Sequence, residues 1–219
     1  MKVVVTGASG FVGRALLAEL LAKGDEVTAV SRGRPRRVEG VRWIAFEQFL
    51  DCPQEELAGV GAVYHVAGRA HVKPRTRRDL NREWEQMREA NTELSRRVAE
   101  ATFAHSGARL VLLSTIGVHG QGTRPGEAIH EESPFSVASP YAASKLDAEV
   151  AVVQAALAWG GTYAIVRAPL VYGVGAPANF GALTRLARSP WPLPFGKATQ
   201  ERAMIGVRNL AAFLRLVAV

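Results

Sequence analysis

The chain has 219 residues, with 27 Lys and Arg against 20 Asp and Glu, a formal net charge of +7, and a hydrophobic fraction of 48%. The length suits one domain with at most a small appendage, and the apolar content excludes a disordered chain. A single cysteine, Cys52, excludes an intramolecular disulfide and a multi-cysteine zinc site. Because we find neither a run of 18 apolar residues nor a signal-peptide pattern, we expect no membrane span and a reducing, cytoplasmic location.

Short apolar runs alternate with helical patterns along the first part of the chain. Lys2–Thr6 is a β-branched run that predicts a buried strand, and Phe11–Lys23 has leucines at helical spacing before Gly24. The same reasoning predicts strands over Val27–Ser31, Val41–Phe46, Val60–Val66, Arg109–Ser114 and Thr162–Arg167, and helices over Asn81–His105 and Tyr141–Trp159. Continuously apolar strands that alternate with helices indicate an α/β fold with a doubly wound parallel sheet.

The pattern changes after Arg167. Prolines interrupt the remaining segment, and no further clear strand-helix unit is predicted there. We therefore interpret residues 1–168 as the doubly wound domain and residues 169–219 as the start of a small substrate-covering subdomain.

The positive charge is concentrated in two stretches, which raises the question of nucleic-acid binding. These stretches contain Arg32, Arg34, Arg36 and Arg37, and then Arg69, Lys73, Arg75, Arg77 and Arg78. Neither stretch contains an aromatic residue that could stack on a base. We therefore expect solvated loops, with room for one phosphate-binding arginine, and no nucleic-acid partner.

Glycines recur at every third position between the first predicted strand and helix. Gly7 allows a tight turn, Gly10 allows the backbone to approach a pyrophosphate, and Gly13 allows close packing of helix on strand. The free N–H groups where the helix begins, at Phe11 and Val12, are suited to binding phosphates. This context predicts a dinucleotide-binding turn and makes residues 1–168 an NAD(P)-binding Rossmann domain.

The end of the second predicted strand bears on which dinucleotide is bound. A carboxylate there would bind the ribose hydroxyls of NAD, but the residues are Ser31 and Arg32. Asp25 and Glu26 precede this strand and lie at the wrong end of the sheet. A guanidinium fork at Arg32 suits a 2′-phosphate, which favours NADP; the alternative is NAD bound without a carboxylate.

Tyr141 and Lys145 stand four residues apart at the start of a predicted helix and therefore share one face. A phenol has a pKa of about 10 and is a poor base at neutral pH. A nearby ammonium and the positive charge of an oxidised nicotinamide both lower the pKa of the phenol. The pair therefore suits acid/base chemistry.

Several motifs occur in the order and spacing of a known family. Residues Thr6–Gly13, Asn91, Ser114-Thr115 and Tyr141-Ala-Ala-Ser-Lys145 resemble the extended short-chain dehydrogenases/reductases, the NAD(P)-dependent sugar epimerase/dehydratase family. Further segments resemble UDP-hexose (UDP-glucose/UDP-N-acetylglucosamine) 4-epimerases of bacterial surface-polysaccharide pathways: Val63–Val72, Pro169–Gly173, Ala178–Phe180, Leu193–Gly196 and Arg202–Leu210. The resemblance implies an enzyme that epimerises a nucleotide sugar by transient oxidation at C4 and return of the hydride.

The resemblance also implies roles for individual residues. Tyr141 would be the catalytic acid/base, Lys145 would bind the nicotinamide ribose and lower the pKa of the tyrosine, and Thr115 would be the hydroxyl partner. Asn91 would fix a water near the lysine. Cofactor contacts are implied for Ala67, Gly68 and Pro169, and contacts to the nucleotide-diphosphate part of the substrate for Asn179, Phe195 and Arg202. A homodimer through two helices per subunit, residues 87–105 and 141–159, is also implied.

Three departures from the family pattern matter. Thr115 is followed by Ile116 and Gly117 rather than by an acidic pair, which argues against sugar 4,6-dehydration. The second departure is the missing acid after the second strand, which favours the alternative of an NADPH-dependent sugar or carbonyl reductase. A non-catalytic dinucleotide-binding sensor or scaffold is the third alternative. The subdomain that ends at Val219 is shorter than the family pattern implies, so we expect it to be truncated.

The histidines give no metal site. His65 lies beside Ala67-Gly68 and is expected to be a packed wall of the cofactor pocket. The other histidines have no metal-ligand spacing and are expected in solvent-facing loops: His71, His105, His119 and His130.

Overall fold

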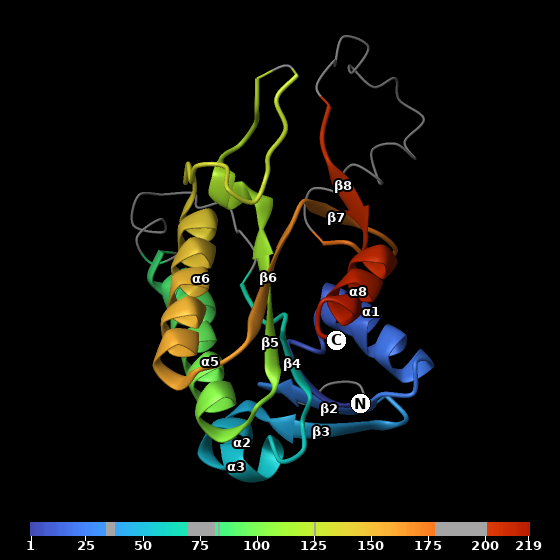
Figure 1. Ribbon diagram of the computed structural model, residues 1–219. Coiled ribbons are helices and arrows are strands. Elements are labelled where there is room, and N and C mark those ends of the chain that lie inside the picture. Colours follow the sequence, from blue (N-terminus) through green and yellow to red (C-terminus); the bar gives the residue numbers. More distant parts are fainter. Residues whose placement is uncertain (34–37, 70–81, 83, 125, 178–200) are drawn as a thin grey trace.

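Figure 1 shows the computed structural model, which describes residues 1–33, 38–69, 82, 84–124, 126–177 and 201–219. Six parallel strands form one sheet: β1 (Lys2–Thr6), β2 (Glu26–Ser31), β3 (Val41–Ala45), β4 (Ala62–His65), β5 (Arg109–Thr115) and β6 (Tyr163–Ala168). Their order is β3-β2-β1-β4-β5-β6, so the strand order reverses between β1 and β4. This topology confirms the predicted doubly wound α/β fold, in which ligands generally bind outside the carboxyl ends of the strands where the order reverses.

Helices cover both faces of the sheet (Figure 1). On one face lie α2 (Phe46–Asp51), α3 (Pro53–Glu56), α5 (Leu94–His105) and α6 (Pro140–Trp159); on the other lie α1 (Phe11–Ala22) and α8 (Val207–Leu216). The alternation of strand side chains decides which residues meet which helices: Val4 joins the α5–α6 side, whereas Val3 and Val5 join the α1–α8 side. Both clusters are buried, which explains the continuously apolar strands.

The helix predicted over Asn81–His105 is interrupted. Residues 84–87 are helical, a π-helical segment η1 (Arg88–Glu93) follows, and α5 continues to His105. A π-helical turn inside an α-helix is rare and is found mostly at functional sites. Here it contains the fully buried Asn91.

The expectation that no strand-helix unit follows Arg167 was wrong. Two short strands, β7 (Leu170–Tyr172) and β8 (Met204–Gly206), pair in parallel, and α8 follows β8 directly. Leu210 and Leu214 of α8 are fully buried and pack with α1 against the sheet. A division at residue 168 into domain and substrate subdomain stays a prediction, because residues 178–200 lie outside the described residues.

Asp25 joins the C-terminal helix to the amino-terminal edge of the sheet. Its carboxylate, 2% exposed, accepts hydrogen bonds from the amino-terminal ammonium of Met1 at 3.0 Å and from Nε of Arg215 at 2.7 Å. Asp25 therefore lies at the edge opposite to the carboxyl ends of the strands, as predicted. Among the helices of the described residues, none combines the length and apolar character needed to cross a bilayer.

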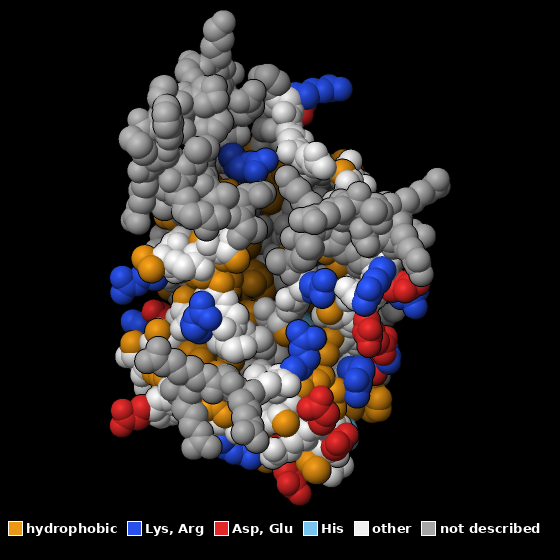
Figure 2. Space-filling view, turned by 180° about the vertical axis from the view of Figure 1, so that it is seen from behind, with side chains coloured by type: hydrophobic (Ala, Val, Ile, Leu, Met, Phe, Trp, Pro, Cys, Tyr) orange, Lys and Arg blue, Asp and Glu red, His pale blue; other side chains and the backbone are white. Residues whose placement is uncertain are grey.

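Charges of both signs intermix on the side of the molecule that carries α5 (Figure 2). On this helix Arg96 pairs with Glu93 and Glu100, one helical turn to either side. The prediction of solvated charges concerned the two basic stretches around Arg32–Arg37 and Arg69–Arg78; it stays a prediction, because residues 34–37 and 70–81 lie outside the described residues.

Candidate active site

The glycine turn after β1 is packed so closely that only glycine fits. Gly7 has φ +73°, and a Cβ atom there would stand 2.5 Å from the backbone N and Cα of Ala67. A Cβ atom on Gly13 would stand 2.2 Å from the carbonyl oxygen of Gly7. The turn after β1 is therefore pressed between the start of α1 and the chain after β4.

The start of α1 lies in this turn. The N–H of Gly10 donates to the carbonyl of Gly7 at 3.0 Å, and α1 begins at Phe11 without a side-chain cap. Gly10 is exposed, and Phe11 and Val12 are partly exposed. Uncapped N–H groups at an open helix start fit a pyrophosphate, so the residues present fit a dinucleotide.

The two described residues that directly follow β2, Arg32 and Gly33, provide a basic group and no acid. Arg32 is exposed, and the hydroxyl of Ser31 donates to the carbonyl of Gly33 at 2.9 Å. Arg32 follows the carboxyl end of β2, the same edge at which Gly7 follows β1. Directly after β2, this edge of the sheet therefore carries a guanidinium and not a carboxylate.

Tyr141 and Lys145 stand on the first turns of α6, where Ser139 caps the helix by accepting the Ala142 N–H at 3.2 Å and Pro140 occupies the first turn. Lys145 is 3% exposed, and burial lowers its pKa to about 8, although the nearby Glu149 carboxylate raises it. Burial raises the pKa of Tyr141. A neighbouring ammonium alone would lower the pKa of Tyr141. In the chain itself the loss of hydration of the phenolate is the larger effect, so the pKa is raised.

Thr115 ends β5 at the same edge of the sheet. Its Oγ1 accepts the N–H of Gly117 at 3.2 Å and so caps a short 3-10 helix, η2 (Ile116–His119). A Cβ atom on Gly117 would stand 3.4 Å from this Oγ1 and 3.9 Å from Cβ of Ala142, which follows Tyr141. Gly117 therefore lies between Thr115 and the start of α6. Pro169 also lies at this edge, between β6 and β7.

Asn91 connects three segments of the site. Its Oδ1 accepts the N–H of Arg69 at 2.7 Å, and its Nδ2 donates to Oγ of Ser144 at 2.9 Å. A Cβ atom on Gly68 would stand 3.0 Å from Oδ1 of Asn91 and 3.8 Å from Nζ of Lys145. The side chain of Asn91 thus holds the loop after β4 against α6. The prediction that Asn91 fixes a water stays a prediction.

His65 lies in a buried chain of hydrogen bonds. Its Nδ1 is 2.6 Å from Oγ1 of Thr6, and its Nε2 is 2.9 Å from Oγ of Ser95. Ser95 donates its hydrogen to the carbonyl of Asn91, so Nε2 of His65 is the donor to Ser95 and Nδ1 is the acceptor from Thr6. Burial lowers the pKa of His65 to about 3, and the imidazole is neutral. His65 is therefore packed between β1 and α5 as predicted, and that it forms a wall of the cofactor pocket stays a prediction.

Of the three residues predicted to contact the nucleotide diphosphate, the structure describes Arg202 alone. Arg202 is exposed and precedes β8, and Asn179 and Phe195 lie outside the described residues. His130 is exposed in a loop as predicted, His105 is exposed but ends the helix α5 rather than lying in a loop, and His71 lies outside the described residues. His119 contradicts the prediction of a solvent-facing loop: it is 8% exposed, because Arg167 and Phe135 pack against it. Within the described ranges no group of three or more His, Cys, Asp or Glu could hold a metal ion.

Two polar residues near the cluster were missed by sequence reasoning. Glu149 lies four residues after Lys145 on α6, and Arg167 lies on β6; the two form a salt bridge of 2.8 Å. The spacing from Lys145 to Glu149 was a usable signal, because residues four apart share a helix face. Nothing in the sequence indicated that Arg167 would be its partner.

Comparison with known proteins agrees with this geometry. The family model described as "NAD dependent epimerase/dehydratase family" matches residues 3–218. The chain is 31% identical over 215 residues to the UDP-glucose 4-epimerase of Vibrio cholerae, covering 95% of this chain and 64% of the relative. It is 34% identical over 218 residues to the dTDP-6-deoxy-L-talose 4-dehydrogenase (NAD(P)(+)) of Kitasatospora kifunensis, covering 96% and 64%.

A solved structure has a similar fold. That of MoeE5 in complex with UDP-glucuronic acid and NAD superposes with a TM-score of 0.80 at 27% identity, over 100% of this chain and 72% of that one. The chain spans just under two thirds, 64%, of the length of the two curated relatives. Because the family model covers nearly the whole sequence and the glycine turn and Tyr141–Lys145 helix stand at one edge of a doubly wound sheet, the chain belongs to the NAD-dependent epimerase/dehydratase family.

Proposed function

We propose that the protein is an NAD(P)-dependent nucleotide-sugar 4-epimerase, which oxidises the sugar transiently at C4 and returns the hydride to the other face. One observation carries the proposal. The buried Lys145 stands beside Gly68, at the carboxyl edge of the sheet where Tyr141 and Thr115 also lie and where the glycine turn follows β1. A cofactor along this edge would meet a substrate held at the tyrosine and threonine.

Each residue has a defined task in this reaction. A bound nicotinamide dinucleotide supplies the acceptor and later the donor of the hydride. Tyr141 takes the proton of the C4 hydroxyl and gives it back when the product forms. The Oγ1 of Thr115 accepts the Gly117 N–H, so its own hydrogen is free to donate to the substrate oxygen. As an ammonium, Lys145 lowers the pKa of Tyr141 and opposes the effect of burial.

The relatives support a nucleotide-sugar substrate, because one is named a UDP-glucose 4-epimerase and the MoeE5 structure contains UDP-glucuronic acid and NAD. Contacts to the nucleotide diphosphate are proposed for Asn179, Phe195 and Arg202. Ile116 and Gly117 after Thr115 oppose a 4,6-dehydratase.

The test begins with the small molecule released by denaturing freshly purified protein, identified by mass and absorbance. Stoichiometric NAD or NADH, together with interconversion of UDP-glucose and UDP-galactose or of their N-acetylhexosamine analogues, supports the epimerase. Bound dinucleotide with no turnover of any nucleotide sugar or carbonyl substrate supports the non-catalytic alternative instead. Failure to bind either dinucleotide contradicts the assignment of the glycine turn.

A reductase that uses NADPH is the second candidate, and Ser31-Arg32 is the observation that favours it. The two residues directly after β2 are an exposed arginine and a glycine, which suits a 2′-phosphate. The Kitasatospora relative is named as using NAD(P)(+). We expect wild-type protein to bind NADPH more tightly than NADH, and Arg32→Glu to reverse this order. If both proteins prefer NADH, Arg32 does not recognise the cofactor.

A homodimer and a cytoplasmic location belong to the same proposal. The exposed face of α6 supports the dimer, because Leu157 is 81% exposed, Trp159 57% and Val150 47%. Sedimentation velocity of the wild type and of a Leu157→Glu variant tests it: we expect a dimer that the charge converts to monomer. A monomeric wild type contradicts this part of the proposal.

A further inference from the structure

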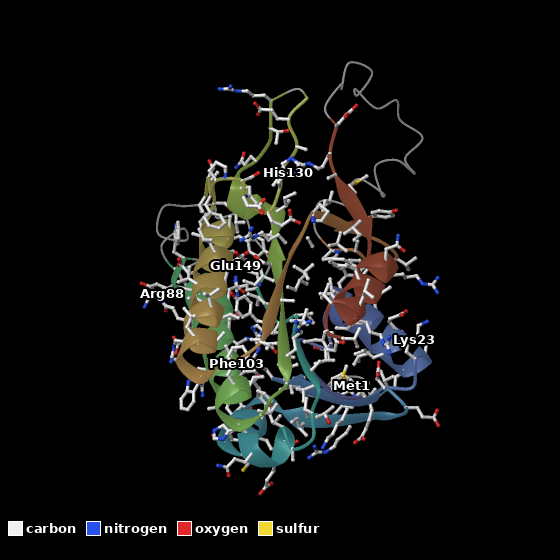
Figure 3. All side chains as sticks on the ribbon, viewed as in Figure 1. Met1, Lys23, Arg88, Phe103, His130 and Glu149 are labelled. Carbon is white, nitrogen blue, oxygen red and sulfur yellow. The ribbon has the colours of Figure 1, made fainter. Side chains whose placement is uncertain are left out.

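The buried Glu149 forms an ion pair with the partly buried Arg167 one helical turn beyond Lys145. The chemistry above involves this pair only through the effect of Glu149 on the pKa of Lys145. Glu149 of α6, 4% exposed, faces the sheet (Figure 3) and binds Arg167 of β6 in two places. Nε of Arg167 lies 3.1 Å and Nη2 lies 2.8 Å from Oε2 of Glu149. Ser114, which precedes Thr115 and stands opposite Arg167 in the sheet, also donates to Glu149. One carboxylate thus connects α6, β5 and β6.

The other side of the guanidinium holds the β5–α6 connection, residues 116–139. Nη1 of Arg167 is 3.1 Å from Nε2 of His119 and 3.1 Å from the carbonyl oxygen of Glu131. The guanidinium carbon lies 5.0 Å from the ring centroid of Phe135, which in turn stacks on His119 at 5.4 Å. Arg167 therefore contacts this connection at both ends of its length.

The hydrogen-bond directions are fixed by Arg167. A guanidinium only donates, so Nε2 of His119 accepts, and Nδ1–H of His119 donates to the carbonyl of Pro134 at 3.3 Å. A lysine could not replace these bonds, because an ammonium lacks the rigid fork that reaches carboxylate, imidazole and carbonyl together. An ion pair with a buried carboxylate does not by itself show that the fold is stabilised. The role of this pair follows from the segments of the chain that it connects.

The connection that Arg167 holds has a reacting group at each end. It begins directly after Thr115 and ends two residues before Tyr141. We propose that Arg167 is a positioning residue, which holds residues 116–139 and α6 in register so that Thr115 and Tyr141 meet the same oxygen of the substrate. This inference rests on the proposed function. Arg167 acts through Glu149 and His119. The glycine turn follows β1, which β4 and β5 separate from β6 in the sheet.

The test compares Arg167→Lys with a matched control, Arg215→Lys. Arg215 also pairs with a buried carboxylate, Asp25, but at the opposite edge of the sheet, and the two arginines are similarly exposed, 22% and 27%. We expect Arg167→Lys to lower kcat/KM for the nucleotide sugar by about ten-fold or more while the Kd for the dinucleotide stays within about two-fold. We expect Arg215→Lys to lower the Tm and leave both constants unchanged.

Hydrogen exchange gives a readout that does not depend on turnover. The amide of Ser136 donates to the carbonyl of Val118 within the connection, at 2.9 Å. We expect it to exchange at least about ten-fold faster in Arg167→Lys and not in Arg215→Lys. Unchanged exchange, or a kinetic loss that Arg215→Lys reproduces, overturns the proposal. If wild-type protein turns over no nucleotide sugar, the proposed function fails, while faster exchange still supports Arg167 as the residue that holds residues 116–139.

Discussion

Gly68 and Lys145 stand against each other although they belong to distant parts of the sequence: a Cβ atom on Gly68 would lie 3.8 Å from the lysine Nζ. The contact joins the loop after β4 to α6 and leaves the ammonium 3% exposed. A charge in such a place loses hydration, which is why burial lowers the pKa of Lys145 to about 8. The positions around this contact lead to four predictions.

Replacing Gly7 by alanine tests the packing of the turn. A methyl group would collide with the backbone of Ala67 at 2.5 Å, at a φ of +73°. We expect Gly7→Ala to lower the free energy of unfolding by at least about 3 kcal/mol and to abolish dinucleotide binding. Gly24→Ala is the control, because its φ is +74° but nothing lies within 4 Å, and it should cost about 1 kcal/mol. Equal losses in urea titrations of both variants would show that the backbone conformation alone matters.

Replacing Tyr141 by phenylalanine removes the acid/base group and keeps the ring. We expect kcat to fall by roughly 10²- to 10⁴-fold and the dinucleotide Kd to change little. Tyr163→Phe removes the hydroxyl of a 38% exposed tyrosine on β6 and should keep full activity. Full turnover by Tyr141→Phe on the true substrate would exclude the phenol from catalysis.

The pKa of Lys145 makes stability depend on pH in the alkaline range. Its pKa is about 8 in the folded chain and near 10.5 in a free side chain, so between these values the unfolded chain binds a proton that the folded chain lacks. The free energy of unfolding should therefore rise with pH, relative to Lys145→Met, by about 2 kcal/mol from pH 7.5 to 9.5. Parallel stability curves for the two proteins would mean that the lysine keeps its ordinary pKa.

His65 produces the same trend, a stability that rises with pH, in the acid range. The unfolded chain takes up a proton at His65 near pH 6.5, whereas the folded chain does so only near pH 3. Lowering the pH from 6.5 to 4.5 should therefore lower the stability of wild type by about 2–3 kcal/mol more than that of His65→Gln. Chemical denaturation at several pH values measures this difference, and an identical acid dependence would contradict a buried neutral imidazole.

The sequence by itself determined the fold class and most of the candidate site. Apolar runs predicted the six parallel strands because strands covered on both faces are buried along their whole length. Gly7 and Gly13 were recognisable because their spacing lies within one strand-turn-helix unit, and Tyr141 and Lys145 because four residues make one turn of one helix. Such signals are local, and the backbone geometry that produces them repeats within a few residues.

Only the tertiary structure decided which distant side chains meet. The partner of Glu149 comes from β6, the partners of Asn91 come from the loop after β4 and from α6, and α8 packs on α1. The buried state of His119 and the raised pKa of Tyr141 also depend on neighbours from other elements. These contacts follow from strand order and from desolvation, which are properties of the assembled sheet and its helices, and no spacing along the chain encodes them.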